Sequence, residues 1–389
     1  MDVKEQNKLC PLYKKCGGCQ LQNLTYPQQL SHKQAKVIKL MGRMCYVDEI
    51  IGMDEPFHYR NKVQSAFGYR NGKLISGIYQ SSTHRIVPCD ECLIEDEVAD
   101  RIVVTIRKLA QSFKLKAYDR ETGRGLIKHV LIKHGFKSGE IMAVIVTAGG
   151  QFPSQRQFVN ALLQRHPEIT TIVRSINDSG VGLLVGERCE NLYGEGYITE
   201  ELCGLKFRIS PRSFYQVNPV QTEVLYNKAV EFAQLSGKER LIDAYCGTGT
   251  IGLIMSQNAG EVIGMELNSD AVRDAKANAT LNRAENIRFV CGDAGKIMRS
   301  MAAEGERADV VVTDPPRAGC SVEFLKSLVK LSPKRVVYIS CNPETLARDL
   351  RFLAKNSYKP TRIQPVDMFP FTDHVECVVR VEKIQKTEK

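Results

Sequence analysis

The sequence lacks the features that would carry the chain into or across a membrane. No apolar run approaches the roughly 20 residues that a membrane-spanning helix needs. The first residues, MDVKEQNKLC, are charged and lack the apolar stretch of a secretory signal, so we expect a cytoplasmic protein with no membrane contact. Hydrophobic content of 43% and charged content of 25% are those of a globular chain, and 389 residues are enough for two domains.

A reducing compartment excludes a disulfide framework for the 13 cysteines and directs attention to metal binding and catalysis. The net charge of +10 is compatible with a polyanionic partner. Residues 101–150 hold ten Lys or Arg, Lys128 and Lys133 among them, but only three Asp or Glu. Such a segment either neutralises nucleic-acid phosphates or is only a solvated face, and composition leaves both open.

From about residue 206 the chain alternates apolar strands with helical patterns, which predicts a parallel α/β sheet flanked by helices. Expected helices are 269–281, 321–331 and 344–355. The last two strands have no helix between them, which predicts an antiparallel hairpin at the sheet edge. Expected strands are 240–245, 261–266, 287–291, 309–314, 335–340, 362–367 and 375–381.

The first 205 residues predict an α+β domain with a mixed or antiparallel sheet. Two helices, 95–113 and 154–166, interrupt its strands. We therefore expect domains at 1–205 and 206–389, with a junction in 198–213. Expected strands of the first domain are 62–69, 73–79, 126–133 and 141–147.

Three successive strand ends carry residues suited to a nucleoside. A glycine-rich turn spans 243–252, where absent side chains let the backbone approach a ligand. Glu266 ends the next strand, where a carboxylate can accept hydrogen bonds from both ribose hydroxyls, and Asp293 follows the third, placed for an adenine amino group. The set favours S-adenosylmethionine over NAD, whose glycine fingerprint the turn matches poorly; a turn with no ligand stays open.

The next two strands end in residues with reactive chemistry. Prolines after Asp314 give a rigid extended exit that can hold its carboxylate over the reactive end of a cofactor. Cys341 follows the fifth strand, directly before a helix that starts at a proline. A buried, inert cysteine is the ordinary alternative. The dipole of the helix favours a thiolate at this position, so we expect a nucleophile.

Taken in order, the motifs resemble those of the RNA uracil-C5 methyltransferase family, which modifies ribosomal RNA and tRNA. The resemblance implies a Rossmann-like S-adenosylmethionine methyltransferase domain preceded by an α+β domain that carries an iron–sulfur cluster. The motifs cover nearly the whole chain: His58-Tyr-Arg-Asn-Lys-Val-Gln64, Ser213-Phe-Tyr-Gln-Val-Asn218, the 243–252 turn, Asp314-Pro-Pro-Arg317, Ser340-Cys-Asn-Pro343 and Phe371-Thr-Asp-His-Val-Glu376.

The resemblance also implies catalytic roles. Cys341 would attack uracil C6 and so make C5 nucleophilic, and Glu376 would be the general base that removes the C5 proton. Asp314 and Gln216 match residues that contact cofactor and flipped base. The remaining cofactor-binding positions fall on Tyr245, Thr250, Glu266 and Asp293.

Three cysteines near the N-terminus, Cys10, Cys16 and Cys19, lie within ten residues and can be aimed at one metal centre. The fourth ligand is Cys92 or Cys89, and alignment on the family pattern favours Cys92. Spacing alone leaves zinc and iron–sulfur open, whereas the resemblance implies a [4Fe–4S] cluster. Four protein ligands would close the site, so we assign it to structure and RNA contact.

The Cys-Gly-Gly-Cys-Gln pattern resembles the large-subunit rRNA enzymes, so we expect 23S rRNA as the partner of a monomer that does not act on DNA. A tRNA uracil-C5 methyltransferase and a noncatalytic iron–sulfur RNA-binding protein are the alternatives. RNA cytosine-C5 methyltransferases place a cysteine after proline on the fourth strand, where this chain has Pro316 and Arg317. Ribosomal members also begin with a small β-barrel, which we expect to be absent here.

Overall fold

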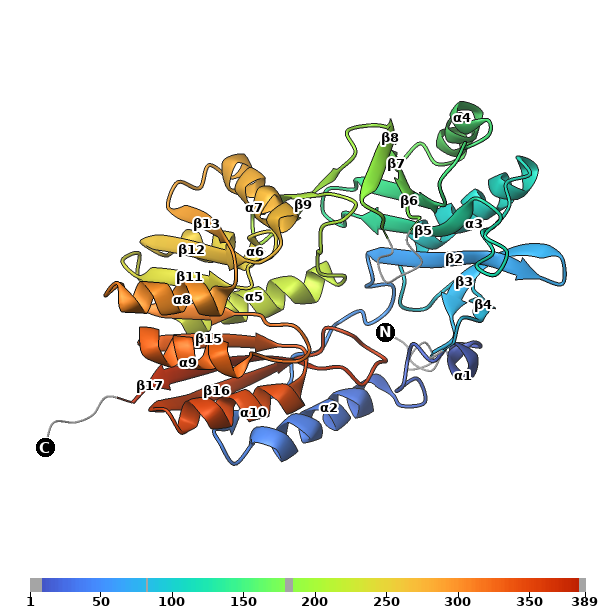
Figure 1. Cartoon of the computed structure of the whole chain (residues 1–389). Coiled ribbons are helices and arrows are strands. Elements are labelled where there is room, and N and C mark those ends of the chain that lie inside the picture. Colours follow the sequence, from blue (N-terminus) through green and yellow to red (C-terminus); the bar gives the residue numbers. More distant parts are fainter. Residues whose placement is uncertain (1–8, 82, 179–184, 385–389) are drawn as a thin grey trace, which may run out of the picture.

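Two sheets lie side by side in the computed structural model, which describes residues 9–81, 83–178 and 185–384 (Figure 1). Within these residues, eight strands form the second sheet in the order β1-β16-β17-β15-β14-β11-β12-β13. Its pairs are parallel except those of β17, which runs antiparallel to both neighbours. The strands are β1 (Tyr46–Val47), β11 (Arg240–Ala244), β12 (Glu261–Glu266), β13 (Ile287–Cys291), β14 (Val310–Thr313), β15 (Arg335–Ser340), β16 (Tyr358–Val366) and β17 (Glu376–Lys383).

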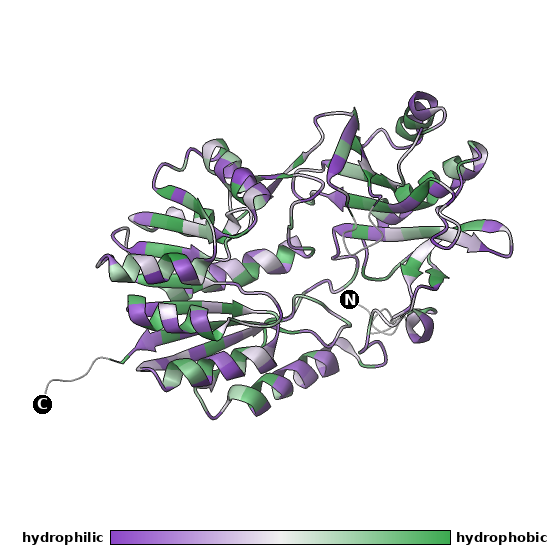
Figure 2. Cartoon of the chain, in the orientation of Figure 1, coloured by the Kyte–Doolittle hydropathy of each residue, from purple (hydrophilic) through white to green (hydrophobic). Residues whose placement is uncertain are grey.

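Helices cover both faces of this sheet because its strands are apolar on both sides. On β11, Leu241 packs into one core and Ile242 into the other, as the alternation of side chains along a strand requires. One core includes α5 (Pro219–Ala233), α6 (Thr250–Ser256) and α7 (Ser269–Leu281). The opposite core includes α2 (Tyr26–Met41), α8 (Ala294–Ala303), α9 (Val322–Leu331) and α10 (Pro343–Ala354). Figure 2 shows the hydrophobic residues along the strands of both sheets.

The first sheet has the order β4-β3-β2-β5-β6-β7-β8 among the described residues, and only its β6–β7 pair is parallel. Two amphipathic helices, α3 (Glu97–Ser112) and α4 (Gln155–Arg165), bury their apolar faces with its strands. A short helix, α1 (Tyr13–Cys16), precedes it, and the hairpin of β9 (Ile198–Leu202) and β10 (Leu205–Ile209) follows it. Its strands are β2 (Lys62–Arg70), β3 (Lys73–Tyr79), β4 (Ile86–Pro88), β5 (Ile127–His134), β6 (Ile141–Thr147), β7 (Ile169–Ile176) and β8 (Arg188–Tyr193).

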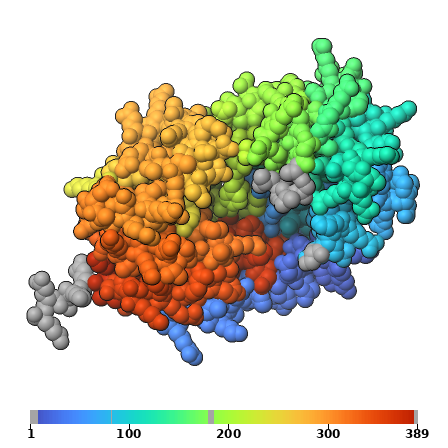
Figure 3. All heavy atoms as spheres, viewed as in Figure 1, coloured from blue at the N-terminus to red at the C-terminus, as the bar shows by residue number. Residues whose placement is uncertain are grey.

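The N-terminal segment does not stay with the first sheet. Helix α2 contacts α10, and β1 pairs in parallel with β16 at the edge of the second sheet. In the space-filling view of Figure 3, the blue atoms of this segment lie against the red atoms of the C-terminal elements. The division at residue 205 remains a prediction about domains, but a stretch of the first part completes the sheet of the second.

The predicted boundaries of most helices and strands differ from the observed ones by at most four residues. The antiparallel hairpin predicted from the last two strands is β16–β17, and β1 lies outside it as the edge strand. Among the described residues, no helix combines the length and apolarity needed to cross a lipid bilayer.

Candidate active site

The glycine-rich turn after β11 opens a cavity at the carboxyl edge of the second sheet. Gly247 and Gly249 have φ values of 53° and 80°, a region that suits glycine. The buried Asp243 carboxylate accepts a hydrogen bond from the Gly252 backbone N–H at 2.8 Å, which ties the end of β11 to the first turn of α6. Asp243 was not among the predicted site residues, and its role here is to hold the turn.

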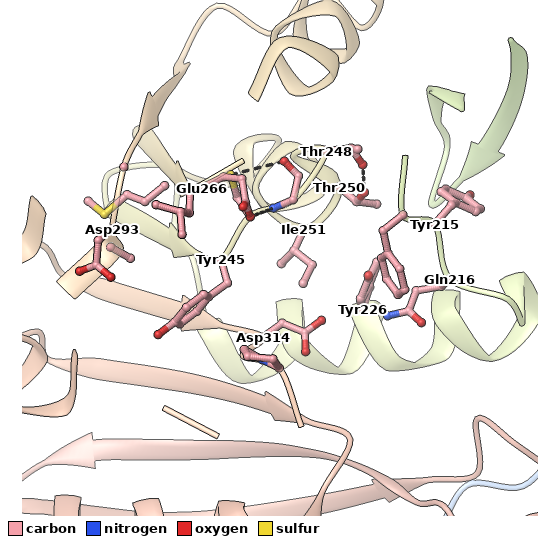
Figure 4. A pocket seen from close by; sticks show the side chains of 18 of the residues that line it. Tyr215, Gln216, Tyr226, Tyr245, Thr248, Thr250, Ile251, Glu266, Asp293 and Asp314 are labelled. Atoms are coloured by element: carbon pink, nitrogen blue, oxygen red, sulfur yellow. Dashed lines mark hydrogen bonds between the residues drawn. The ribbon is translucent and has the colours of Figure 1, made fainter. Parts of the chain in front are cut away.

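The acidic residues at the next two strand ends face the same cavity. The Glu266 carboxylate accepts backbone N–H hydrogen bonds from Gly247 at 3.1 Å and Asn268 at 2.8 Å. Asp293 caps α8 by accepting from the Lys296 N–H at 2.8 Å. Both side chains therefore have fixed positions beside the turn, as Figure 4 shows.

The cavity has a volume of about 470 Å³, enough for a nucleoside-sized ligand. Its lining contains every predicted cofactor residue: Gln216, Tyr245, Thr250, Glu266, Asp293 and Asp314. Burial raises the pKa of Asp314 to about 7. Phe214 and Tyr215, from the Ser213–Asn218 motif, also line the cavity.

Tyr226 on α5 is a lining residue that sequence reasoning missed. Burial and the nearby Asp314 carboxyl raise the pKa of its hydroxyl well above the usual value. Figure 4 shows Tyr226 and Gln216 side by side. No motif marked Tyr226, because α5 itself was not predicted; the proline after Asn218, which caps this helix, was the available signal.

Cys341 and Glu376 come together through strand register. In the antiparallel β15–β17 pair, Ser340 lies opposite Cys377. One step further along this register places Cys341 opposite Glu376 at the carboxyl end of β15. Asp314 follows β14, the parallel neighbour of β15, so all three predicted catalytic residues gather at one end of three adjacent strands.

The surroundings of Cys341, Glu376 and Asp314 favour the protonated, uncharged form of each side chain. Burial, followed by the carboxylates of Glu376 and Asp314, raises the pKa of the Cys341 thiol to about 11, whereas the Arg317 guanidinium lowers it. Burial and Asp314 raise the pKa of Glu376 to about 8, and Arg317 again opposes the shift. The thiolate expected from the dipole of α10 is therefore not the favoured form, because burial and two carboxylates outweigh the helix terminus.

A second cleft of about 590 Å³ lies between Arg317 and the cysteine segment, and Cys341, Glu376 and Asp314 are not part of its lining. Phe214 and Gln216 line both this cleft and the cofactor cavity, so the two spaces adjoin at these residues. Its cations are Arg60, Lys62 and Arg317, and Glu95 is the acid in its lining. At the far end the lining contains Cys16, Cys19 and Cys92.

The four predicted metal ligands, with Cys89, line one small cavity of about 30 Å³. The rest of its lining is Leu12, Tyr13, Ile78 and Val87. A hydrogen bond from the Cys89 thiol lowers the pKa of Cys92 to about 6, with backbone N–H groups of Ile94 and Glu95 acting in the same direction. In the described ranges no three such side chains are arranged as metal ligands, so the metal site stays a prediction.

Two lysines of the basic 101–150 segment do not present a surface for RNA. Lys133 is buried, and its Nζ donates to the backbone oxygens of Ser210 at 2.7 Å and Ser213 at 2.9 Å. Lys128 is half-buried, with its Nζ 4.2 Å from the centre of the Tyr118 ring. Both ammonium groups are used within the fold, and RNA contact by the rest of the basic 101–150 segment stays a prediction.

Comparisons with known proteins agree with this arrangement. The family profile described as tRNA (Uracil-5-)-methyltransferase matches residues 192–384. An uncharacterised RNA methyltransferase of Halalkalibacterium halodurans is 45% identical over 378 residues, which cover 96% of this chain and 82% of that protein. An uncharacterised RNA methyltransferase of Caldanaerobacter subterraneus subsp. tengcongensis is 42% identical over 382 residues, which cover 97% of this chain and 84% of that protein.

One solved structure covers nearly the whole fold. It is the Pyrococcus abyssi tRNA (uracil-54, C5)-methyltransferase in complex with S-adenosyl-L-homocysteine, with a TM-score of 0.78 and 27% identity over 94% of this chain and 85% of that one. The parallel sheet, its terminal antiparallel hairpin and the acidic strand ends define an S-adenosylmethionine-dependent methyltransferase. The chain belongs to the RNA uracil-C5 methyltransferase family.

Proposed function

We propose that this enzyme methylates C5 of a uridine in 23S rRNA through a covalent adduct between Cys341 and uracil C6. The observation that carries the proposal is the gathering of Cys341, Glu376 and Asp314 at one end of adjacent strands, where Asp314 also lines a nucleoside-sized cavity. Uracil C5 is a weak nucleophile, and a thiolate added at C6 moves the electrons of the C5–C6 double bond onto C5. Cys341 would be the nucleophile for the first half of the reaction, addition at C6 and methylation at C5. Glu376 would be the base for the second half, removal of the C5 proton and release of the enzyme.

S-adenosylmethionine, when bound, supplies a methyl group on a positively charged sulfur, ready for transfer to a carbon nucleophile. We assign Glu266 to the ribose hydroxyls and Asp293 to the adenine amino group. Tyr245 and Thr250 complete the walls of this part of the cavity. Asp314 in the cavity and Gln216, which lines both the cavity and the cleft, are assigned to the reacting ends of cofactor and base.

Glu376 completes the cycle by accepting the proton of C5. The electrons of that C–H bond then reform the C5–C6 double bond, and the Cys341 sulfur leaves as a thiolate. A buried carboxyl whose pKa is about 8 is a stronger base than an exposed glutamate once it is ionised. Arg317, which lowers the pKa of both groups, stabilises the thiolate and the carboxylate in turn.

The RNA would approach through the 590 Å³ cleft, where three cations can meet phosphates. Phe214, whose side chain is 67% exposed where the cleft meets the cavity, offers a ring against which a base removed from its stack can lie. The cysteine pattern favours 23S rRNA. A tRNA substrate is the second candidate, because the matching family profile and the Pyrococcus relative are both named for tRNA.

A [4Fe–4S] cluster held by Cys10, Cys16, Cys19 and Cys92 is part of the proposal. The convergence of these thiols on one apolar cavity supports it, and the backbone N–H groups near Cys92 are suited to a thiolate ligand. The Cys89 thiol keeps its proton as a hydrogen-bond donor, whereas backbone N–H groups beside Cys92 favour a thiolate there, which favours Cys92 as the fourth ligand. The cluster would support the far end of the RNA cleft.

Two variants test the covalent cycle because they block it at opposite ends. Cys341→Ala should abolish methylation and form no adduct, since nothing attacks C6. Glu376→Gln should still attack and methylate, but elimination stops, so a methylated RNA–protein species should survive denaturing electrophoresis.

Wild-type protein with 5-fluorouridine RNA gives the matched control, because fluorine at C5 cannot leave as a proton and the adduct should persist. Methylation by Cys341→Ala would disprove the mechanism, as would normal turnover by Glu376→Gln without a trapped species.

A further inference from the structure

The connection between β16 and β17 directly precedes the proposed base. Val366 pairs with Glu376, so residues 367–375 close a hairpin whose first paired residue after the loop is Glu376 itself. The same loop brings His374 to Arg317, at 3.2 Å between Nε2 and Nη2. The position of this loop therefore affects the positions of both Glu376 and Arg317.

One face of α2 holds the loop, through side chains at helical spacing. Lys33 donates from Nζ to Oδ1 of Asp367 at 2.6 Å and to the Phe369 oxygen at 3.0 Å. One turn earlier, Gln29 accepts the Phe371 N–H at 2.7 Å. One turn later, Lys36 reaches Oδ2 of Asp373 at 3.2 Å.

The Lys33–Asp367 pair has no solvent exposure at either side chain. A buried ion pair adds little net stability compared with apolar residues of similar size, because both charges lose their hydration. Its geometric effect is larger, since a short charge-assisted hydrogen bond fixes the relative positions of the two elements. A lysine that also binds the Phe369 carbonyl holds the loop at two points.

The residues just before α2 reach the same loop. The Leu21 N–H donates to the Phe371 oxygen at 2.9 Å, and the Gln20 side-chain oxygen accepts the Asp373 N–H at 3.3 Å. These contacts join sequence positions more than 300 residues apart. The N-terminal segment is therefore one support of the loop, beside Tyr59 and the α5 region, where Asn218 and Gln221 donate to the Met368 and Asp367 oxygens.

We propose that Lys33 is a positioning residue for the methyltransferase reaction: through Asp367 and Phe369 it fixes the loop that sets the place of Glu376. This inference rests on the proposed function. Cys341 is carried by β15 and does not depend on the loop in the same way. Loss of Lys33 should therefore impair removal of the C5 proton more than attack and methylation.

The test compares Lys33→Met with Lys39→Met, the same change at an exposed lysine of the same helix. In Lys33→Met, kcat should fall about 10- to 100-fold, the range expected for a misplaced catalytic group. The methylated RNA–protein adduct should accumulate on ordinary RNA, and affinity for S-adenosylhomocysteine should stay within about twofold of wild type. Lys39→Met should match wild type in all three measurements.

A double variant separates positioning from stability. Lys33→Met alone leaves the Asp367 carboxylate buried without its cation, whereas Lys33→Met with Asp367→Asn removes both charges. The double variant should regain thermal stability and still accumulate adduct. Recovery of turnover together with stability would overturn the proposal, and so would wild-type turnover in Lys33→Met.

Two further outcomes are informative. If wild type with 5-fluorouridine RNA and Glu376→Gln both trap adduct but Lys33→Met loses adduct and turnover together, α2 supports the whole site and the positioning role is wrong. If neither wild type nor Glu376→Gln traps an adduct, the covalent mechanism itself fails, and this inference fails with it.

Discussion

Breakdown of the methylated adduct should depend on pH through Glu376. Burial and the neighbouring Asp314 carboxylate raise its pKa to about 8. The base is the ionised form, which is present above this pKa and lost as the pH falls through it. About one tenth of Glu376 is ionised at pH 7 and about nine tenths at pH 9, so elimination should become about tenfold faster.

A pH jump isolates this step. The methylated adduct is formed with excess enzyme at pH 6, where elimination is slow, then mixed rapidly into buffers from pH 6.5 to 9.5 and quenched in detergent. In the adduct the sulfur of Cys341 is a thioether, so the thiol pKa of about 11 does not enter the profile. Asp314, with a pKa of about 7, interacts with Glu376 and should broaden the rise.

The matched control is Glu382→Gln, the same change near the far end of the same strand, where the side chain is 40% exposed. It should reproduce the wild-type profile, whereas adduct of Glu376→Gln should persist at every pH. Decay rates that do not change between pH 7 and 9 would refute the reasoning. The same rise in Glu376→Gln would show that another group removes the proton.

The remaining predictions concern the cluster and the substrate. Anaerobically purified protein should be brown and contain about four irons per chain; Cys92→Ser should lose them and Cys89→Ser should keep them. Zinc in place of iron would exclude the cluster, and the reverse pattern in the two variants would make Cys89 the ligand. Deletion of the gene should remove one 5-methyluridine from 23S rRNA and leave tRNA unchanged; loss from tRNA alone would identify the second candidate.

The sequence predicted most accurately those elements whose signals are local. The strands at 261–266, 287–291 and 335–340 and the helix at 269–281 lie at the predicted residues. Each strand is a short apolar run, and the helix begins at Asn268, whose side chain accepts from two N–H groups of the first turn. The site at the carboxyl edge follows from such elements, because parallel strands end on the same side of a sheet.

What the sequence did not reveal depends on contacts between distant residues. Nothing in the local sequence indicates that α2 packs against the second sheet. Its partners on the β16–β17 loop lie more than 300 positions away along the chain. Lys133 was expected at the surface because lysine is rarely buried without a partner; here two backbone oxygens serve as partners. The pKa of Cys341 was misjudged for the same reason, because burial and facing carboxylates belong to the fold and not to the motif.

The two halves of the proposed cycle are carried by different parts of the chain, and this separation explains why they can be tested one at a time. Cys341 directly follows β15, which lies between β14 and β17 in the middle of the sheet and is fixed by both neighbours. Glu376 begins a strand after a loop whose hydrogen bonds run to the N-terminal helix. If the proposed cycle holds, attack should depend on the sheet, whereas proton removal should depend also on residues encoded at the opposite end of the sequence. A change in α2 that leaves the sheet intact should convert the enzyme from one that turns over into one that stays bound to its RNA.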